Sequence, residues 1–141
     1  MQWIIGPLKK YADFSGRASR IEFWLFLLFV TALTAAANYV DGAEGRDVAI
    51  AMNMGIIELS VTLLFLLPSI TVSVRRLHDT GRSGWWTMLI YIPWLATLAS
   101  QSNPALVLVS SGALLVGGIA WIILLLLPGS EGENAFGLPP L

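Results

Sequence analysis

The sequence predicts an all-α, polytopic membrane protein, a single domain over residues 1–141 with four transmembrane helices, both termini in the cytoplasm and an N-terminal interfacial amphipathic segment. Three observations predict it. Of the 141 residues 56% are hydrophobic and only 12% are charged, and the mean hydropathy is +0.74, well outside the usual range of soluble globular chains. Apolar runs cover approximately residues 23–40, 50–74, 85–100 and 106–127. Basic residues fall almost entirely on one side of these runs.

The lengths of the apolar runs favour membrane spans. A bilayer core of about 30 Å needs about 20 apolar residues in a helix, which three runs supply comfortably, while residues 85–100 form a short one. The helices of a soluble bundle, which is the alternative, would show a polar face at every turn, and these runs mostly do not. The first apolar run is also too long for a secretory signal, so we expect the first span to remain in the mature protein.

The N-terminal segment is separated from the first span by a break. Residues 1–14 mix apolar and aromatic side chains with two lysines, a composition suited to lying at the headgroup boundary. Ser15 and Gly16 interrupt this segment. Ser19 and Glu22 then have the spacing of a capping box, which predicts that a helix begins there and continues as the first span.

The second span contains a carboxylate that allows two interpretations. A carboxylate at mid-membrane costs about 2.5–3.5 kcal/mol on insertion scales. Glu58 is therefore either a transport carboxylate or, if the helix begins near Ile56, a residue at the wet outer boundary, and we favour the boundary. Asn38 of the first span is expected to form an interhelical hydrogen bond, and Pro68 is expected to kink the second helix.

The loop at residues 75–84 is expected to be cytoplasmic and to separate the second and third spans. Thr80 and Gly81 predict the end of one helix, and Ser83 is placed to cap the next. Indole rings prefer the headgroup level. Three tryptophans are therefore predicted interface anchors: Trp24, Trp85 and Trp86.

The fourth span carries small residues, and the tail after it is rich in glycine and proline. Ala113 and Gly117 have small-xxx-small spacing, which lets another backbone approach closely, either from the same chain or from a second copy in a homo-oligomer. The tail, residues 128–141, is expected to be irregular and cytoplasmic.

The distribution of charge predicts the topology. Seven of the eight basic residues lie on one side of the predicted spans, and they are Lys9, Lys10, Arg17, Arg20, Arg75, Arg76 and Arg82. Arg46 falls in the opposite loop. Since basic residues accumulate in cytoplasmic loops, both termini and the loop at 75–84 are placed in the cytoplasm.

On this topology a cytoplasmic ionic cluster is expected from Arg17, Arg20, Glu22, Arg75, Arg76, Asp79 and Arg82. We expect Asp79 to pair with an arginine of the first motif, and Glu22 to pair with Arg75 or Arg76. Some guanidinium groups of the cluster should then remain available to bind an external phosphate.

A phosphate contact is predicted at Arg82, Ser83 and Gly84, because the amides at a helix N-terminus and an arginine can together hold an anion. The stretch lacks the longer Gly–Lys pattern of nucleotide-binding loops. A lipid headgroup is therefore the expected anion.

We predict no catalytic residues, no cofactor, no metal site and no nucleic-acid partner. His78 is the single histidine, and adjacent residues such as His78 and Asp79 rarely face each other, so a structural role is favoured over an acid/base pair. The sequence has no Cys, and one His with scattered carboxylates provides no metal-ligand spacing.

Three segments together resemble the DUF805 family of small bacterial inner-membrane proteins. They are residues 14–24 (FSGRASRIEFW), residues 75–86 (RRLHDTGRSGWW), and Pro128–Gly129 with Gly132, Asn134 and Gly137. The similarity runs nearly end to end and is most specific in the middle motif. In the tail, Phe136 stands where the family tends to have Tyr, and Leu138 where it often has an acid. The resemblance implies a four-span protein of the bacterial plasma (inner) membrane and no established activity.

These observations predict a binding or scaffolding membrane protein whose basic cytoplasmic face engages anionic lipid headgroups or a protein partner. The alternative is a small proton- or cation-coupled transporter that uses Glu58. A membrane enzyme acting on lipid headgroups is the third interpretation.

Overall fold

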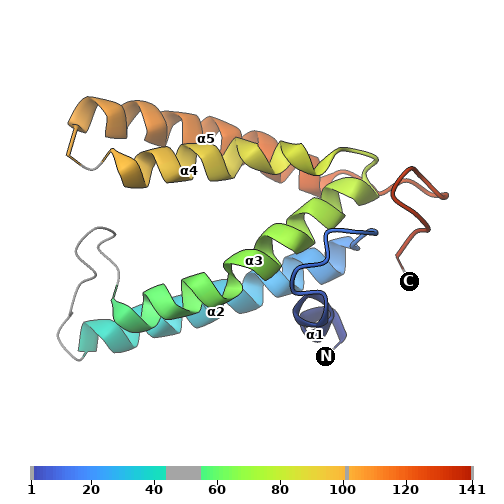
Figure 1. The fold of residues 1–141 in the computed structure, drawn as a ribbon, viewed down its shortest axis with the longest axis horizontal. Coiled ribbons are helices and arrows are strands. Elements are labelled where there is room, and N and C mark those ends of the chain that lie inside the picture. Colours follow the sequence, from blue (N-terminus) through green and yellow to red (C-terminus); the bar gives the residue numbers. More distant parts are fainter. Residues whose placement is uncertain (1, 44–54, 101, 141) are drawn as a thin grey trace. The chain divides into compact units, whose positions relative to one another are not determined.

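The computed structural model describes residues 2–43, 55–100 and 102–140, and over these ranges the chain is all-α (Figure 1). The α helices are α1 (Gln2–Lys9), α2 (Arg20–Ala43), α3 (Ile56–Asp79), α4 (Met88–Ala99) and α5 (Pro104–Leu126), and a 3-10 helix, η1 (Gly84–Thr87), precedes α4. The all-α part of the prediction is therefore confirmed for the described residues.

Three helices, α2, α3 and α5, are long and apolar enough to cross a membrane. α4 has 12 residues, about 18 Å of helix, which is less than a bilayer core. The start of the predicted second span, residues 50–54, lies outside the described residues.

The chain divides into two compact units, and the boundary passes within α3. The first unit holds α1, nearly all of α2, and α3 as far as Val72. The second unit holds Ser15–Arg20, the end of α3 from Ser73, η1, α4, α5 and the tail.

In the first unit, α2 and α3 pack as a helical hairpin. The rings of Phe29 in α2 and Phe65 in α3 meet edge to face, with their centroids 5.9 Å apart. Near the end of α2, the carboxylate of Asp41 accepts hydrogen bonds from the backbone amides of Ile57 (3.2 Å) and Glu58 (2.8 Å). Because the first amides of a helix have no intrahelical partner, Asp41 acts as a cap for α3 supplied by the neighbouring helix.

The segment after α1 compensates for the proline in α3. Pro68 has no N–H, so the carbonyl of Leu64, four residues earlier, lacks its usual helical donor. The hydroxyl of Tyr11 donates to that carbonyl at 2.6 Å. The hydroxyl of Thr71 donates to the Pro68 carbonyl at 3.0 Å. The N-terminal segment is thereby joined to α3 at its proline.

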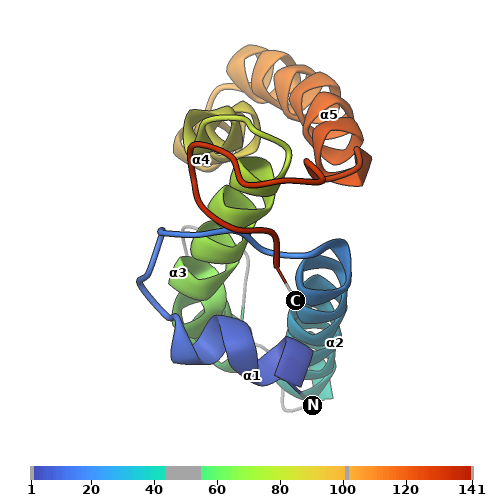
Figure 2. The ribbon, with the colours of Figure 1, turned by 90° about the vertical axis from the view of Figure 1, so that its right-hand side faces the viewer.

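In the second unit, α4 and α5 form an antiparallel hairpin, visible from two sides in Figures 1 and 2. Gly117 of α5 packs directly against the backbone carbonyl of Leu89 in α4, so that a Cβ at this position would overlap it. The backbone of α4 therefore packs closely against the small-residue face of α5 at Gly117. At the turn, Asn103 caps α5, since its side-chain oxygen accepts from the amides of Ala105 (3.1 Å) and Leu106 (3.3 Å).

Candidate functional site

The candidate site forms where α3 ends, within the second unit. The helix closes with a Schellman motif, in which the amide of Gly81 donates to His78 O and the amide of Arg82 donates to Leu77 O, both at 3.0 Å. Gly81 has φ +71°, a left-handed conformation that glycine adopts without strain. The helix end predicted at Thr80 and Gly81 is therefore confirmed.

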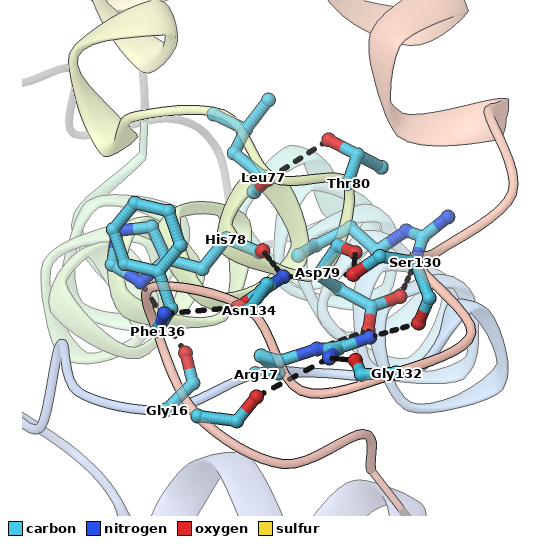
Figure 3. A network of polar contacts seen from close by, with 12 residues as sticks. Gly16, Arg17, Leu77, His78, Asp79, Thr80, Ser130, Gly132, Asn134 and Phe136 are labelled. Carbon is cyan, nitrogen blue, oxygen red and sulfur yellow. Dashed lines mark hydrogen bonds and ion pairs between the residues drawn. The ribbon is translucent and has the colours of Figure 1, made fainter.

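The centre of the site is the carboxylate of Asp79 (Figure 3). Its Oδ1 accepts from Nε of Arg17 at 2.9 Å and lies 2.8 Å from Nη2 of the same side chain. Its Oδ2 accepts from Nη1 of Arg76. Asp79 is 4% exposed, Arg17 6% and Arg76 0%. Two buried arginines thus share one buried carboxylate, and we call these three residues, with the carbonyls of Ser130 and Gly132, the tail clasp.

Arg17 holds the tail through its remaining donors. Nη1 donates to the carbonyls of Gly132 (2.6 Å) and Gly137 (3.3 Å), and Nη2 donates to the carbonyl of Ser130 (2.6 Å). All three nitrogens of the guanidinium group are therefore directed at oxygens. Since burying an unsatisfied charged donor is costly, these carbonyls are part of what makes the buried cation tolerable.

Arg76 uses its other donors at the end of α5. Nε donates to the carbonyl of Leu125 at 3.0 Å, and Nη2 donates to the carbonyl of Leu127. The last carbonyls of a helix accept no hydrogen bond from within the helix, and they form the negative end of its dipole. Arg76 thus caps α5 from the neighbouring helix and joins the ends of α3 and α5.

The tail is also fixed through the backbone of α3. The amide of Ser130 donates to the carbonyl of Asp79 at 2.9 Å, and the side-chain amide of Asn134 donates to the carbonyl of His78 at 2.9 Å. A Cβ at Gly129 would overlap the Asp79 carboxylate, so only glycine fits there. The tail has no α helix among its described residues, as predicted, but its irregular backbone has a defined path.

His78 connects three segments of the chain. Its ring stacks on Phe136 with centroids 3.9 Å apart and an interplanar angle of 5°. Its Nδ1 lies 3.2 Å from the carbonyl of Gly16, a geometry in which the imidazole N–H donates. Phe136 therefore contributes a ring face, a contact that needs no hydroxyl group. The structural role of His78 stays a prediction.

Other members of the predicted ionic cluster lie outside the tail clasp. Arg75 is buried, and its carbonyl accepts from the amide of Ala18 at 3.0 Å. Arg20 is exposed. Glu22 belongs to the first unit, so its pairing with Arg75 or Arg76 stays a prediction.

The three residues of the predicted phosphate contact have different surroundings. Ser83 caps η1, because its hydroxyl oxygen accepts from the amide of Trp85 at 3.4 Å, as predicted. Gly84 packs on α3, where an added Cβ would come within 2.6 Å of Val74. Arg82 is half-buried, and its one hydrogen bond to the described residues is long, 3.4 Å to a carbonyl of its own loop.

The three predicted interface anchors differ in exposure. Trp24 is half-buried and contacts Phe23 edge to face with centroids 5.0 Å apart. Trp85 and Trp86 are 78% and 48% exposed. Trp85 and Trp86 therefore present indole surface a few residues after Arg82 in the chain, while the anchoring role of all three tryptophans stays a prediction.

Glu58 lies in the first turn of α3 and is half-buried. Its Oε2 accepts from the side-chain amide of Asn38 at 2.7 Å, which confirms the interhelical hydrogen bond expected of Asn38. The helix begins at Ile56, as the boundary interpretation of Glu58 requires, and its location at the outer boundary stays a prediction.

Two parts of this arrangement were not predicted from the sequence. One is the set of backbone carbonyls that the two clasp arginines bind, for which the only signals were Gly129 and Gly132 in the tail. The other is the Tyr11 contact, which could have been anticipated by asking what satisfies the carbonyl left free by Pro68.

Comparison with known proteins gives a consistent result. A family model described as "Protein of unknown function (DUF805)" matches residues 11–138. The chain is similar to two Escherichia coli (strain K12) proteins, inner membrane protein YhaH (33% identical, covering 99% of this chain and 97% of the relative) and inner membrane protein YhaI (29%, covering 99% and 96%). It is also 27% identical to the uncharacterized protein YiiR of the same strain, over 89% of this chain and 84% of that protein. No solved structure matches the chain.

Proposed function

Since this chain belongs to the DUF805 family and is a multi-pass inner-membrane protein, we propose that it is a binding protein whose basic cytoplasmic face engages anionic lipid headgroups. The family has no established activity, so the proposal is based on the site. What supports it is how the arginines of that site are divided between internal and external roles.

In the tail clasp, Arg17 and Arg76 donate their hydrogen bonds to Asp79 and to backbone carbonyls. Arg82 is different, because it is only half-buried and its hydrogen bond within the loop is long. A guanidinium group in this state can bind a phosphate with two donors. The single observation that carries the proposal is therefore Arg82, with one long hydrogen bond to the described residues, in the same short stretch of chain as the exposed indoles of Trp85 and Trp86.

The proposal includes four spans with both termini in the cytoplasm. η1 and α4 follow each other directly, and together they extend about 26 Å, close to a bilayer core. The asymmetry of the basic residues supports the orientation.

Single cysteines test this topology in a chain that has no cysteine of its own. Cys replacing Ser102 or Glu44 should react with an impermeant thiol reagent in intact cells, whereas Cys replacing Thr80 or Ser130 should react only after permeabilisation. Glu44 lies outside the described residues, and Ser102 lies at the turn between α4 and α5. Equal labelling at Thr80 and Ser102 would show that α4 does not span, and the reverse pattern would refute the orientation.

Lipid retention tests the function. We expect the full-length protein, purified in detergent and measured by native mass spectrometry, to retain phosphatidylglycerol in preference to phosphatidylcholine. Arg82→Ala should abolish that preference, and Arg82→Lys should restore part of it, since lysine keeps the charge but loses the two-pronged geometry. Ser111→Ala, at an exposed position of α5, is the control. An unchanged preference in Arg82→Ala would contradict the proposal.

A further inference from the structure

An apolar groove runs along the seam between α4 and α5, inside the second unit. Its first part, about 580 Å³, lies next to η1, and its second part, about 680 Å³, extends toward the turn at Asn103. The two parts share Ile92, Pro93 and Ala113, so they form one continuous groove along the hairpin.

The composition of the groove changes from one end to the other. Trp85 and Trp86 line the end next to η1. Arg82 precedes Trp85 by three residues, a separation of at most about 11 Å along the backbone, which is within reach of an arginine side chain and a phosphate between them. Leu89, Ile92 and other apolar residues line the length beyond the tryptophans. The first part of the groove is thus lined by apolar and aromatic side chains, with Arg82 three residues before its first lining residue, Trp85. The far end next to Asn103 also has the polar side chains of Ser100, Ser102 and Ser110.

We propose that this groove holds an acyl chain of an anionic phospholipid whose phosphate lies at Arg82. The inference rests on the proposed function and specifies the ligand as an intact diacyl lipid rather than a phosphate group alone. The chemistry of the groove matches a molecule with one anionic end and a flexible apolar chain. Each of the two parts has a volume within the range of small-molecule sites, about 300–1,000 Å³.

A second transmembrane helix is a poorer match for the same groove. A helix with its side chains is about 10–12 Å across, and it would gain nothing from a cation at the mouth. Between apolar helices in a bilayer the lipid tails compete on equal terms, so an occupant that also brings a phosphate for Arg82 is favoured. Charge complementarity therefore selects the lipid.

Filling the groove tests the proposal without touching the cation. Ala113 lines both parts of the groove and is exposed, so Ala113→Phe places a ring inside it. Ser111→Phe adds the same ring at an exposed position outside the lining and is the matched control. The probes are dioleoyl phosphatidylglycerol and glycerol 3-phosphate, which shares the headgroup phosphate but has no acyl chain.

The measurement is native mass spectrometry of the full-length protein with each probe. We expect Ala113→Phe to lower the retained phosphatidylglycerol by about ten-fold, with Ser111→Phe close to wild type and glycerol 3-phosphate not retained by any of the three. If Arg82→Ala loses the lipid but Ala113→Phe keeps it, the groove proposal fails and the headgroup proposal stands. If neither variant changes retention, both fail. If Ala113→Phe instead converts a dimer to a monomer with lipid unchanged, the groove holds a second copy and the lipid proposal is overturned.

Discussion

Replacing Asp79 with alanine should destabilise the protein strongly, because it removes the carboxylate of the tail clasp and leaves two buried guanidinium groups behind. Arg17 and Arg76 are almost fully excluded from solvent, and both donate to this carboxylate. Without it, two like charges remain close together in a site excluded from solvent. The tail should loosen as well, since Arg17 also carries the bonds to Ser130 and Gly132.

The expected magnitude follows from the contacts that survive. Removing one member of a buried ion pair costs about 3–5 kcal/mol, because the remaining charge is left uncompensated. Asp79 serves two arginines, but both keep carbonyl acceptors, so we expect a loss within that range rather than twice as large. Asp79→Asn keeps the size and one acceptor oxygen, and we expect about half the loss, since hydrogen bonds to charged groups contribute about 1.5–3 kcal/mol each.

Thermal unfolding of the detergent-solubilised full-length protein measures this effect. For a chain of this size the loss corresponds to a melting temperature lower by roughly 10 °C or more. Limited proteolysis should cut the tail of Asp79→Ala faster than that of the wild type. Glu133→Ala, which removes an exposed carboxylate from the same tail, is the control and should stay within about 0.5 kcal/mol. If the Asp79 and Glu133 variants melt together and their tails resist protease equally, the reasoning about the clasp is wrong.

Three further predictions follow from other contacts. Tyr11→Phe should cost about 1 kcal/mol in thermal stability, and the cost should largely vanish in a Pro68→Ala background, where the new amide can satisfy the free carbonyl; an equal cost in both backgrounds would exclude this pairing. Gly129→Ala should lower the melting temperature because its Cβ overlaps the clasp carboxylate, whereas Gly132→Ala, with open space around it, should do so much less; equal shifts would refute the close packing. Glu58→Gln should express and melt like the wild type, because a glutamine oxygen can still accept from Asn38. Loss of a measured proton-coupled flux in that variant, at normal expression, would instead favour the transporter interpretation.

The sequence by itself determined the features that depend on local chemistry. Long apolar runs identified helices α2, α3 and α5, and the motif residues identified the family. Helix ends were also predictable, because capping needs specific residues within a few positions of the end, as at Gly81 and Ser83. All of these signals are contained in short stretches of chain.

Only the tertiary structure decided which charged groups meet and what else they bind. The sequence allowed either Arg17 or Arg20 to pair with Asp79, and the structure buries Arg17 on it while Arg20 is exposed. The other acceptors of Arg17 and Arg76 are backbone carbonyls, and every residue has one, so the sequence cannot distinguish those that bind. The same applies to Tyr11, whose partner is a carbonyl 53 positions away that became available only because Pro68 donates no hydrogen bond. The folded backbone determines which carbonyls lie within hydrogen-bonding distance of a buried arginine. No residue type in the sequence indicates which carbonyls these are.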